Sequence, residues 1–340
     1  MSMKRFCMVA LTIMAGFMAT AQDKSVKEIQ STAQRTNADD TAHKKGWKVG
    51  GLVSINIGQG GSHNWAAGAE KFSFSTAAFL SAFANIKDGR WNWTNSLALS
   101  YAFVNASSTG VRKTDDKIDL LSKVGYGLNA KFDLSGVVNF RSQFTDGFEY
   151  NYFGKGLQHR ISGFFAPAYL VVAPGFTWHP VPYFSVFASP VSARFVFVTN
   201  DPYSYVSATG NLPTGERETP LASNYGVDTA RKVKVEVGAF ASAEFNKEIF
   251  KNVVLKSRVD LYSNYLKSKR LGDVGDGKAR PQNVDVFWTS VLAMKVNKWL
   301  TVNYNFDLIY DDDVRQFGPD KTSAGTQTRT MLSVGFTTKF

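Results

Sequence analysis

The chain is nearly free of cysteine and has no long apolar run. Its single cysteine, Cys7, lies in an N-terminal stretch typical of a signal peptide, so neither a disulfide framework nor thiol chemistry is expected afterwards. Beyond that stretch no window reaches the ~18 consecutive apolar residues of a transmembrane helix. These absences exclude a disulfide-stapled secreted domain and a helical membrane protein.

Histidine is also scarce, and no catalytic motif is visible. The four histidines show no metal-ligand spacing, and neither an HExxH nor a GxSxG sequence occurs. We therefore predict no catalytic, metal-binding or cofactor-binding residues and no enzymatic activity. The run Asp311-Asp312-Asp313 is interpreted as a solvated acidic patch, with a Ca²⁺ site as the alternative.

The N-terminal region predicts export. Lys4 and Arg5 precede an apolar stretch from Val9 to Met18 and the small residues 19–21, so residues 1–21 are predicted to be a signal peptide. Residues 22–46 are polar and are interpreted as a flexible periplasmic lead-in, a small plug in the barrel mouth being the alternative. Residues 47–340 form the third predicted region.

The formal charge is strongly positive. Removal of Lys4 and Arg5 with the signal lowers the net charge from +11 to +9. The charges are dispersed along the chain, and an exported chain rarely meets nucleic acid. Anionic lipid headgroups or anionic solutes are therefore the better partners.

Twelve segments of alternating polarity occupy the region from Trp47 to Phe340. The predicted strands are 47–58, 71–86, 91–105, 116–130, 132–145, 166–180, 182–198, 231–246, 249–265, 283–297, 298–311 and 327–340. Several prolines in the sixth and seventh segments predict bulges there.

The connections between these segments alternate in length. The odd-numbered connections are predicted to be long, and the even-numbered ones tight, near Asp88-Gly89, Asp133, His179-Pro180, Asn246-Lys247 and Asn297-Lys298. Such sorting is typical of an outer-membrane barrel with short periplasmic turns and long outer loops. We predict an all-β, antiparallel up-and-down barrel of about twelve strands, ten or fourteen remaining open, with both termini in the periplasm.

Alternation separates a lipid-facing set from a lumen-facing set. Many aromatic residues fall near strand ends, which is typical of interfacial girdles. The polar face predicts the lumen lining, with a slight basic excess: Lys117, Lys123, Arg141, Lys232, Lys234, Lys256 and Arg258 against Asp119, Glu236, Glu244, Asp260 and Asp307. These charges predict either a salt-bridge network that fills a narrow barrel or the wall of an anion-favouring pore.

The last segment alternates apolar and polar residues and ends in phenylalanine. Phe336 and Phe340 are predicted to form the signal by which barrel-assembly machinery recognises its clients during biogenesis. A terminal strand that pairs with the first also removes both sheet edges.

Several motifs in order resemble the DUF3078 proteins of Bacteroidota. They are Asn64-Trp65 with Gly68, the run 93–101, the run 113–118, Gln143-Phe144 with Gly147-Phe148, and the run 188–191. The resemblance would cover nearly the whole mature chain. It implies an outer-membrane β-barrel of a Gram-negative, Bacteroidota-like bacterium and supplies no catalytic or binding residues.

The leading functional hypothesis is a passive or weakly anion-selective channel for small solutes. The alternative is a non-conducting structural or assembly subunit whose long loops, especially 199–230, dock a protein partner. An interfacial lipid hydrolase is the third hypothesis; it would require His63 or His159 close to a serine at the outer lipid boundary.

Overall fold

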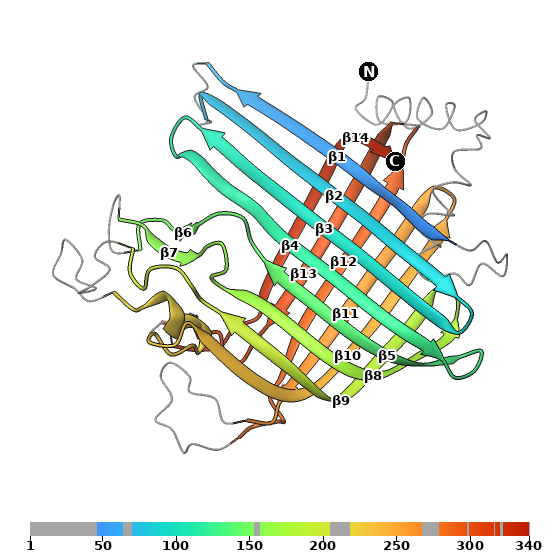
Figure 1. Ribbon diagram of the computed structural model, residues 1–340. Helices are drawn as coiled ribbons and strands as arrows, with labels where there is room; N and C mark the ends of the chain where they lie inside the picture. Colours follow the sequence, from blue (N-terminus) through green and yellow to red (C-terminus); the bar gives the residue numbers. More distant parts are fainter. Residues whose placement is uncertain are drawn as a thin grey trace, which may run out of the picture.

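The computed structural model describes residues 46–63, 70–152, 157–204, 218–266, 279–297, 299–315, 317–319 and 322–339. Twelve of its strands close into one antiparallel barrel, each next to its neighbour in sequence (Figure 1). These strands are β1 (Trp47–Gly61), β2 (Phe72–Asp88), β3 (Trp91–Ala106), β4 (Gly110–Gly127), β5 (Phe132–Ser142), β8 (Ala168–Val181), β9 (Phe184–Phe197), β10 (Val233–Phe250), β11 (Val253–Asn264), β12 (Val284–Lys295), β13 (Leu300–Tyr310) and β14 (Gln327–Lys339). The predicted transmembrane barrel and its count of twelve strands are confirmed.

Three further elements lie outside the barrel wall. β6 (Gly147–Glu149) and β7 (His159–Ser162) pair as a separate two-stranded sheet between β5 and β8. A short 3₁₀ helix, η1 (Leu221–Tyr225), lies between β9 and β10. In the part of the chain that the structure describes, no helix is long and apolar enough to cross a membrane. None of these three elements was predicted from the sequence.

The connections follow the predicted asymmetry with one exception. β3 and β4 continue past the predicted ends, and only Ser107 to Thr109 turn between them, so the third connection is short rather than long. Two tight turns also come later than predicted, at Pro182-Tyr183 and Lys251-Asn252, because His179 and Asn246 remain inside β8 and β10. The rim of short turns is the predicted periplasmic end.

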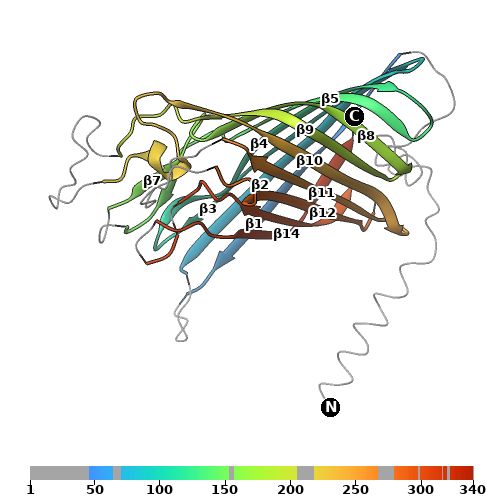
Figure 2. The ribbon, with the colours of Figure 1, turned by 90° about the horizontal axis from the view of Figure 1, so that it is seen from below.

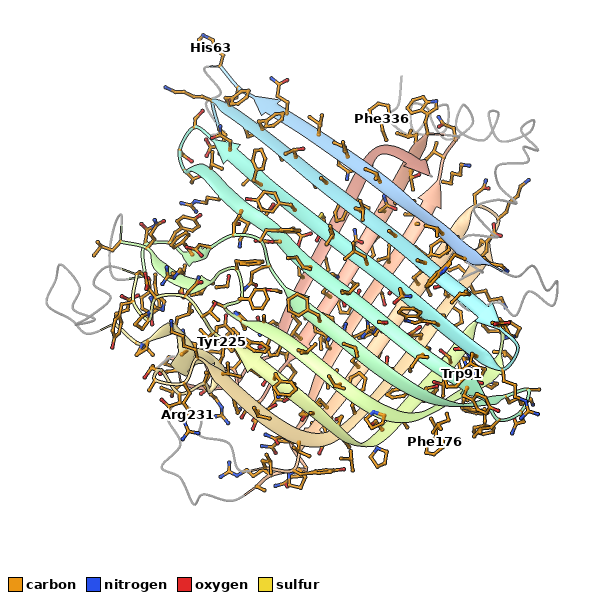
Figure 3. The ribbon with its side chains drawn as sticks, viewed as in Figure 1. His63, Trp91, Phe176, Tyr225, Arg231 and Phe336 are labelled. Carbon is orange, nitrogen blue, oxygen red and sulfur yellow. The ribbon has the colours of Figure 1, made fainter. Side chains whose placement is uncertain are left out.

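The outer wall is apolar, and exposed aromatic side chains lie toward both ends of its strands. Trp91 and Phe336 lie on this surface, whereas His63 marks the opposite end of β1 (Figure 3). Trp47 stacks edge-on with Trp93, and the rings of Trp299 and Phe336 lie parallel. Exposed rings at strand ends match the girdle expected at a lipid–water interface.

Bulges interrupt the wall where the prolines predicted them. The register of β8 with β9 shifts between Val172 and Phe176, and that of β9 with β10 shifts next to Gly238. Side chains replace the lost ladder bonds: the Ser189 hydroxyl donates to the Pro174 carbonyl at 2.6 Å, and the Ser192 hydroxyl donates to the Gly238 carbonyl at 2.8 Å. The carbonyls therefore remain satisfied inside a membrane-spanning wall.

Closure of the barrel rests on a short ladder between its first and last strands. β1 pairs with β14 from Leu52–Lys339 to Ile55–Phe336, whereas β1 pairs with β2 along its whole length. Gly335 lies close to Asn56 at the point where this ladder ends, and a Cβ there would meet the Asn56 side chain at 2.1 Å. Glycine at this position therefore permits the two strands to approach.

Described parts of the long connections pack together at the end of the barrel predicted to be extracellular, and this packed region is called the cap. η1 contributes Leu221, Ala222 and Tyr225 to a buried apolar cluster, which also contains the last residues of β9 and part of the β13–β14 connection. The members of this cap cluster are Ala166, Val196, Val198, Leu221, Ala222, Tyr225, Val227 and Val314. The view from below places η1 and β7 at the same end of the barrel, away from the C-terminus (Figure 2).

Several sequence-based predictions lie outside the described residues. These are the signal peptide, nearly all of the lead-in, and Phe340 of the assembly signal. Phe336 is described, and its ring is 65% exposed on the outer wall.

Candidate functional site: a capped chamber in the barrel lumen

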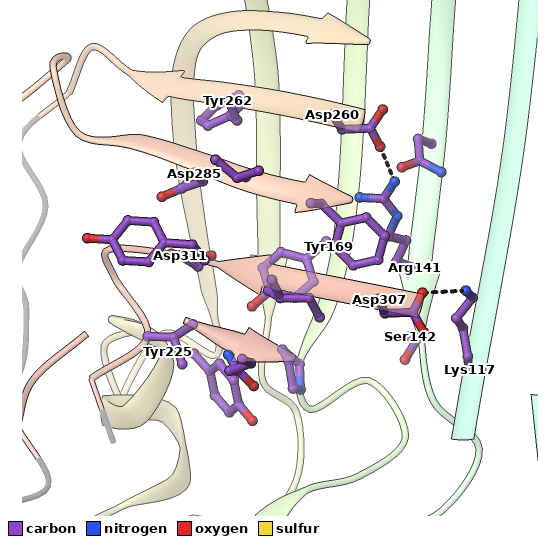
Figure 4. A pocket seen from close by; sticks show the side chains of 18 of the residues that line it. Lys117, Arg141, Ser142, Tyr169, Tyr225, Asp260, Tyr262, Asp285, Asp307 and Asp311 are labelled. Atoms are coloured by element: carbon purple, nitrogen blue, oxygen red, sulfur yellow. Dashed lines mark hydrogen bonds and ion pairs between the residues drawn. The ribbon is translucent and has the colours of Figure 1, made fainter. Parts of the chain in front are cut away.

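A chamber of about 460 Å³ lies in the lumen beneath the cap. Its walls come from strands β4, β5 and β8 to β14, together with Ile161 of β7 and Tyr225 of η1. Acidic, basic and tyrosine side chains face the same space (Figure 4). The chamber therefore combines charged and tyrosine side chains with apolar wall supplied by residues such as Phe240 and Phe287.

The first of three ion-pair networks crosses the middle of the lumen. Arg141 of β5 reaches Asp260 of β11 and lies 3.4 Å from Asp119 of β4. Arg258 of β11 pairs with Asp260 at 2.8 Å and with Asp119 at 3.7 Å. Because β5 and β11 are not neighbours in the wall, this network ties opposite sides of the barrel together. Its two cations balance its two anions.

The second network joins β4 to the last two strands. Lys117 lies 3.5 Å from Asp307 of β13, and Arg329 of β14 pairs with Asp307 and with Asp115 of β4. It also crosses the lumen, since β1 to β3 separate these strands along the wall. Its charges balance as well. The salt-bridge filling predicted from the sequence is therefore present.

The third network lies just under the cap and is acidic. Arg194 of β9 pairs with Glu236 of β10 and, at 2.7 Å, with Asp285 of β12. Lys234 pairs with Glu236 and with Asp313, both at 2.6 Å. Asp311 completes the network, 3.7 Å from Arg194. Among the described residues, two cations thus face four carboxylates.

The crowding of carboxylates has an electrostatic consequence in the loop that follows β13. Burial, and then the negative charge of Asp285, raises the pKa of Asp311 to about 7. Its Oδ1 atom accepts a hydrogen bond from the backbone N–H of Asp313 at 2.9 Å. Asp311, Asp312 and Asp313 are all buried, so the predicted solvated acidic patch was wrong: this connection folds into the mouth.

Most of the lining residues predicted from the sequence take part in ion pairs. The members found in the networks above are Lys117, Asp119, Arg141, Lys234, Glu236, Arg258, Asp260 and Asp307. Lys123 is buried and lies on the same face of β4 as Lys117 and Asp119. Lys256 shares the inward face of β11 with Arg258, and the residue is exposed to solvent.

The position of Lys232 differs from the predicted one in the lumen lining. This residue precedes β10, its side chain is exposed, and its φ of 57° turns the chain, so the alternation of β10 does not extend to it. Arg194, Asp285, Asp311 and Arg329 were missed. Asp285 and Arg329 occupy inward positions of their strands, so the same alternation could have identified them. Asp311 lies in a connection, where alternation gives no information. Among the described residues, the three networks together contain six cations and eight carboxylates, so the ion pairs themselves carry no basic excess.

His159 lies in the cap rather than at a lipid boundary. It is buried, its Nδ1 atom lies 2.8 Å from a Glu218 carboxylate oxygen, and its ring stacks on Tyr152. His63 is exposed in the β1–β2 connection. Within the described ranges, no group of three or more His, Cys, Asp or Glu side chains is arranged to hold a metal ion.

Comparison with solved structures finds outer-membrane barrels of low similarity. The COG4313 outer membrane channel from Pseudomonas putida F1 has 12% identity and a TM-score of 0.39, over 88% of this chain and 97% of that one. The translocator domain of the autotransporter NalP from Neisseria meningitidis has 10% identity and a TM-score of 0.32, over 92% and 96%. A FadL homologue from Pseudomonas aeruginosa has 12% identity and a TM-score of 0.30, over 91% of each chain.

Sequence comparison is more restricted. No curated protein matches the chain. A family model described as a protein of unknown function (DUF3078) matches residues 57–148, from the second half of β1 into β6. The DUF3078 resemblance predicted from the sequence is therefore confirmed over this stretch.

Proposed function

We propose that the protein is a passive outer-membrane channel for small charged solutes, closed by its cap and by cross-lumen ion pairs in the conformation described. The observation that carries the proposal is the capped chamber of about 460 Å³, lined by charged side chains. Lys256 supports it, because its exposed position on the inward face of β11 is consistent with water in the lumen on the other side of the first network from the chamber.

The networks provide the gate of this proposed channel. Each crosses the lumen between strands that are not neighbours, so a continuous water path requires rearrangement of these charged side chains or of the cap. Rings of charge set selectivity in pores. Among the described residues, the third network presents excess acid, whereas Lys256 presents a cation further down the lumen that pairs with no described carboxylate. We therefore propose that the two levels act in opposite directions on selectivity.

Single-channel recording in planar bilayers tests the proposal, with the reversal potential measured under a salt gradient. Lys256→Glu is expected to shift the reversal potential toward cations, because it inverts a charge beside open lumen. Lys232→Glu is the matched control: the same charge change outside the strand leaves the reversal potential unchanged. A folded, heat-modifiable barrel that never conducts would contradict the channel.

The cross-lumen ion pairs also favour a second candidate, a non-conducting barrel that presents its loops to a protein partner. A lumen braced at three levels suits a rigid scaffold as well as a closed pore. Absence of conductance together with co-purification of one defined partner would support this alternative.

A further inference from the structure

Among the described residues, the carboxylates outnumber the cations in only one of the three networks. The first and second networks are neutral, whereas the third sets Glu236, Asp285, Asp311 and Asp313 against Arg194 and Lys234. All four carboxylates belong to residues that are largely shielded from solvent. A buried excess of negative charge is costly unless protons or a cation neutralise it.

Two of these carboxylates line the chamber and keep acceptor capacity. Asp285 receives Arg194 on one oxygen and the backbone N–H of Asp312 on the other, at 3.0 Å. The Oδ2 atom of Asp311 lies 3.7 Å from the Arg194 guanidinium, which is beyond hydrogen-bond distance. A carboxylate has about four lone-pair sites, so both side chains can accept further donors from the chamber.

A tyrosine hydroxyl provides an independent sign of a ligand. Tyr262 of β11 lines the chamber and is 5% exposed, and its hydroxyl has no hydrogen-bond partner among the described residues. Its ring lies under the Arg194 guanidinium at 4.2 Å, which fixes its position beside the acidic network. Buried hydroxyl groups are ordinarily hydrogen-bonded, so this one is suited to a partner that enters the chamber.

We propose that the chamber binds a small organic cation through a primary ammonium group, held by the carboxylates of Asp285 and Asp311 and the hydroxyl of Tyr262 (Figure 4). An ammonium group carries three N–H donors, and these three side chains offer the matching acceptors. Phe240 and Phe287 supply apolar wall for the attached carbon chain. The claim that this cation is the transported solute rests on the proposed channel. The claim that the chamber binds the cation does not depend on transport.

Isothermal titration calorimetry on the full-length barrel, folded in detergent, tests the site. n-Butylammonium is the probe, tetramethylammonium has the same charge without N–H donors, and butyrate has the opposite charge. We expect n-butylammonium to bind, tetramethylammonium to bind at least several-fold more weakly, and butyrate not to bind. Affinity for n-butylammonium should increase between pH 5 and pH 8, because Asp311 loses its proton over this range while the amine keeps its own.

Two variants separate the site from general attraction to an acidic protein. Asp311→Asn should weaken n-butylammonium binding by about tenfold or more, since it removes a charge-assisted bond. Tyr262→Phe keeps the ring and should weaken binding several-fold. Asp146→Asn is the control, because Asp146 lies in the outer loops, half-exposed, and should bind like the wild type.

Specific results would overturn the proposal. These are no heat of binding with n-butylammonium at tens of millimolar, equal affinity in both site variants and the wild type, or preferential binding of Mg²⁺ or Ca²⁺ that n-butylammonium does not displace. Titration does not require conduction. A barrel that binds n-butylammonium but never conducts would contradict the channel and keep the site, whereas a conducting barrel without binding would do the reverse.

Discussion

The two ends of this barrel are built on different principles. The periplasmic end has tight turns, a girdle of exposed aromatic rings and, in Lys256, a lumen cation for which the structure shows no ion pair with a described residue. The extracellular end has a folded-in cap and a buried acidic network. The difference teaches that local alternation is sufficient to shape the wall, whereas the chamber depends on charges that loops bring together.

Removal of Arg194 should lower the stability of the barrel more than the other substitutions considered. Arg194→Ala leaves three neighbouring carboxylates without their shared cation, and loss of one partner of a buried pair costs about 3–5 kcal/mol. The measurement is the urea midpoint of unfolding in detergent, with Arg194→Lys as a partial rescue. Lys256→Ala is the matched control and should change stability by less than about 0.5 kcal/mol, since it breaks no described ion pair. Equal effects would remove the distinction between the two ends.

The pH dependence of stability should also arise at the extracellular end. The folded-state pKa of Asp311 is raised from 3.8 to about 7, so its contribution is fully present below pH 3.8 and is lost as the pH rises to about 7. The slope is at most about 1.4 kcal/mol per pH unit in that window. The groups that face Asp311 are Asp285, Arg194, Asp313, Glu236 and Tyr169.

Asp311→Asn is the test of this slope, measured as the urea midpoint at a series of pH values between 4 and 8. The variant should flatten the profile across the window. A profile that keeps its full slope would show that another group in the network carries the proton.

A smaller effect is expected in the wall between the two ends. Ser192→Ala removes the hydroxyl that donates to the Gly238 carbonyl at the β9–β10 bulge. Loss of this bond should cost about 1–3 kcal/mol, because the carbonyl is left unsatisfied in a membrane-spanning strand. The same urea midpoint measures it, and Ser185→Ala, an inward serine of the regular part of β9, is the comparison. Identical values would mean that the bulge needs no side-chain support.

Much of the wall could be predicted from the sequence. Strands such as β3 and β13 alternate strictly, so Trp91 and Trp93 lie outside and Asp307 lies inside, as their positions require. Proline in β8 and β9 also predicted bulges, because a residue without an N–H cannot complete a ladder. The short β3–β4 turn was missed, since the polar stretch before Asp116 resembles a loop although it pairs as strand.

The candidate site was only half predictable for a related reason. Arg141, Arg258 and Asp260 follow from alternation, but their pairing across the lumen depends on which strands face each other. Lys232 was misplaced because a left-handed residue ends the alternation one step before the strand begins. Asp311 and Asp313 were interpreted as solvated because nothing local indicates that their loop turns inward.

The sequence by itself determined the barrel, an approximate strand number and the face on which most side chains lie, because period-two alternation is a local property that lipid and water enforce on every strand. Only the tertiary structure decided how the lumen is charged. Ion pairs such as Arg194 with Asp285 join residues far apart in the chain, and the cap buries carboxylates that no neighbouring residue marks as internal. Closure of the barrel places them together, and that closure is a global property of the fold.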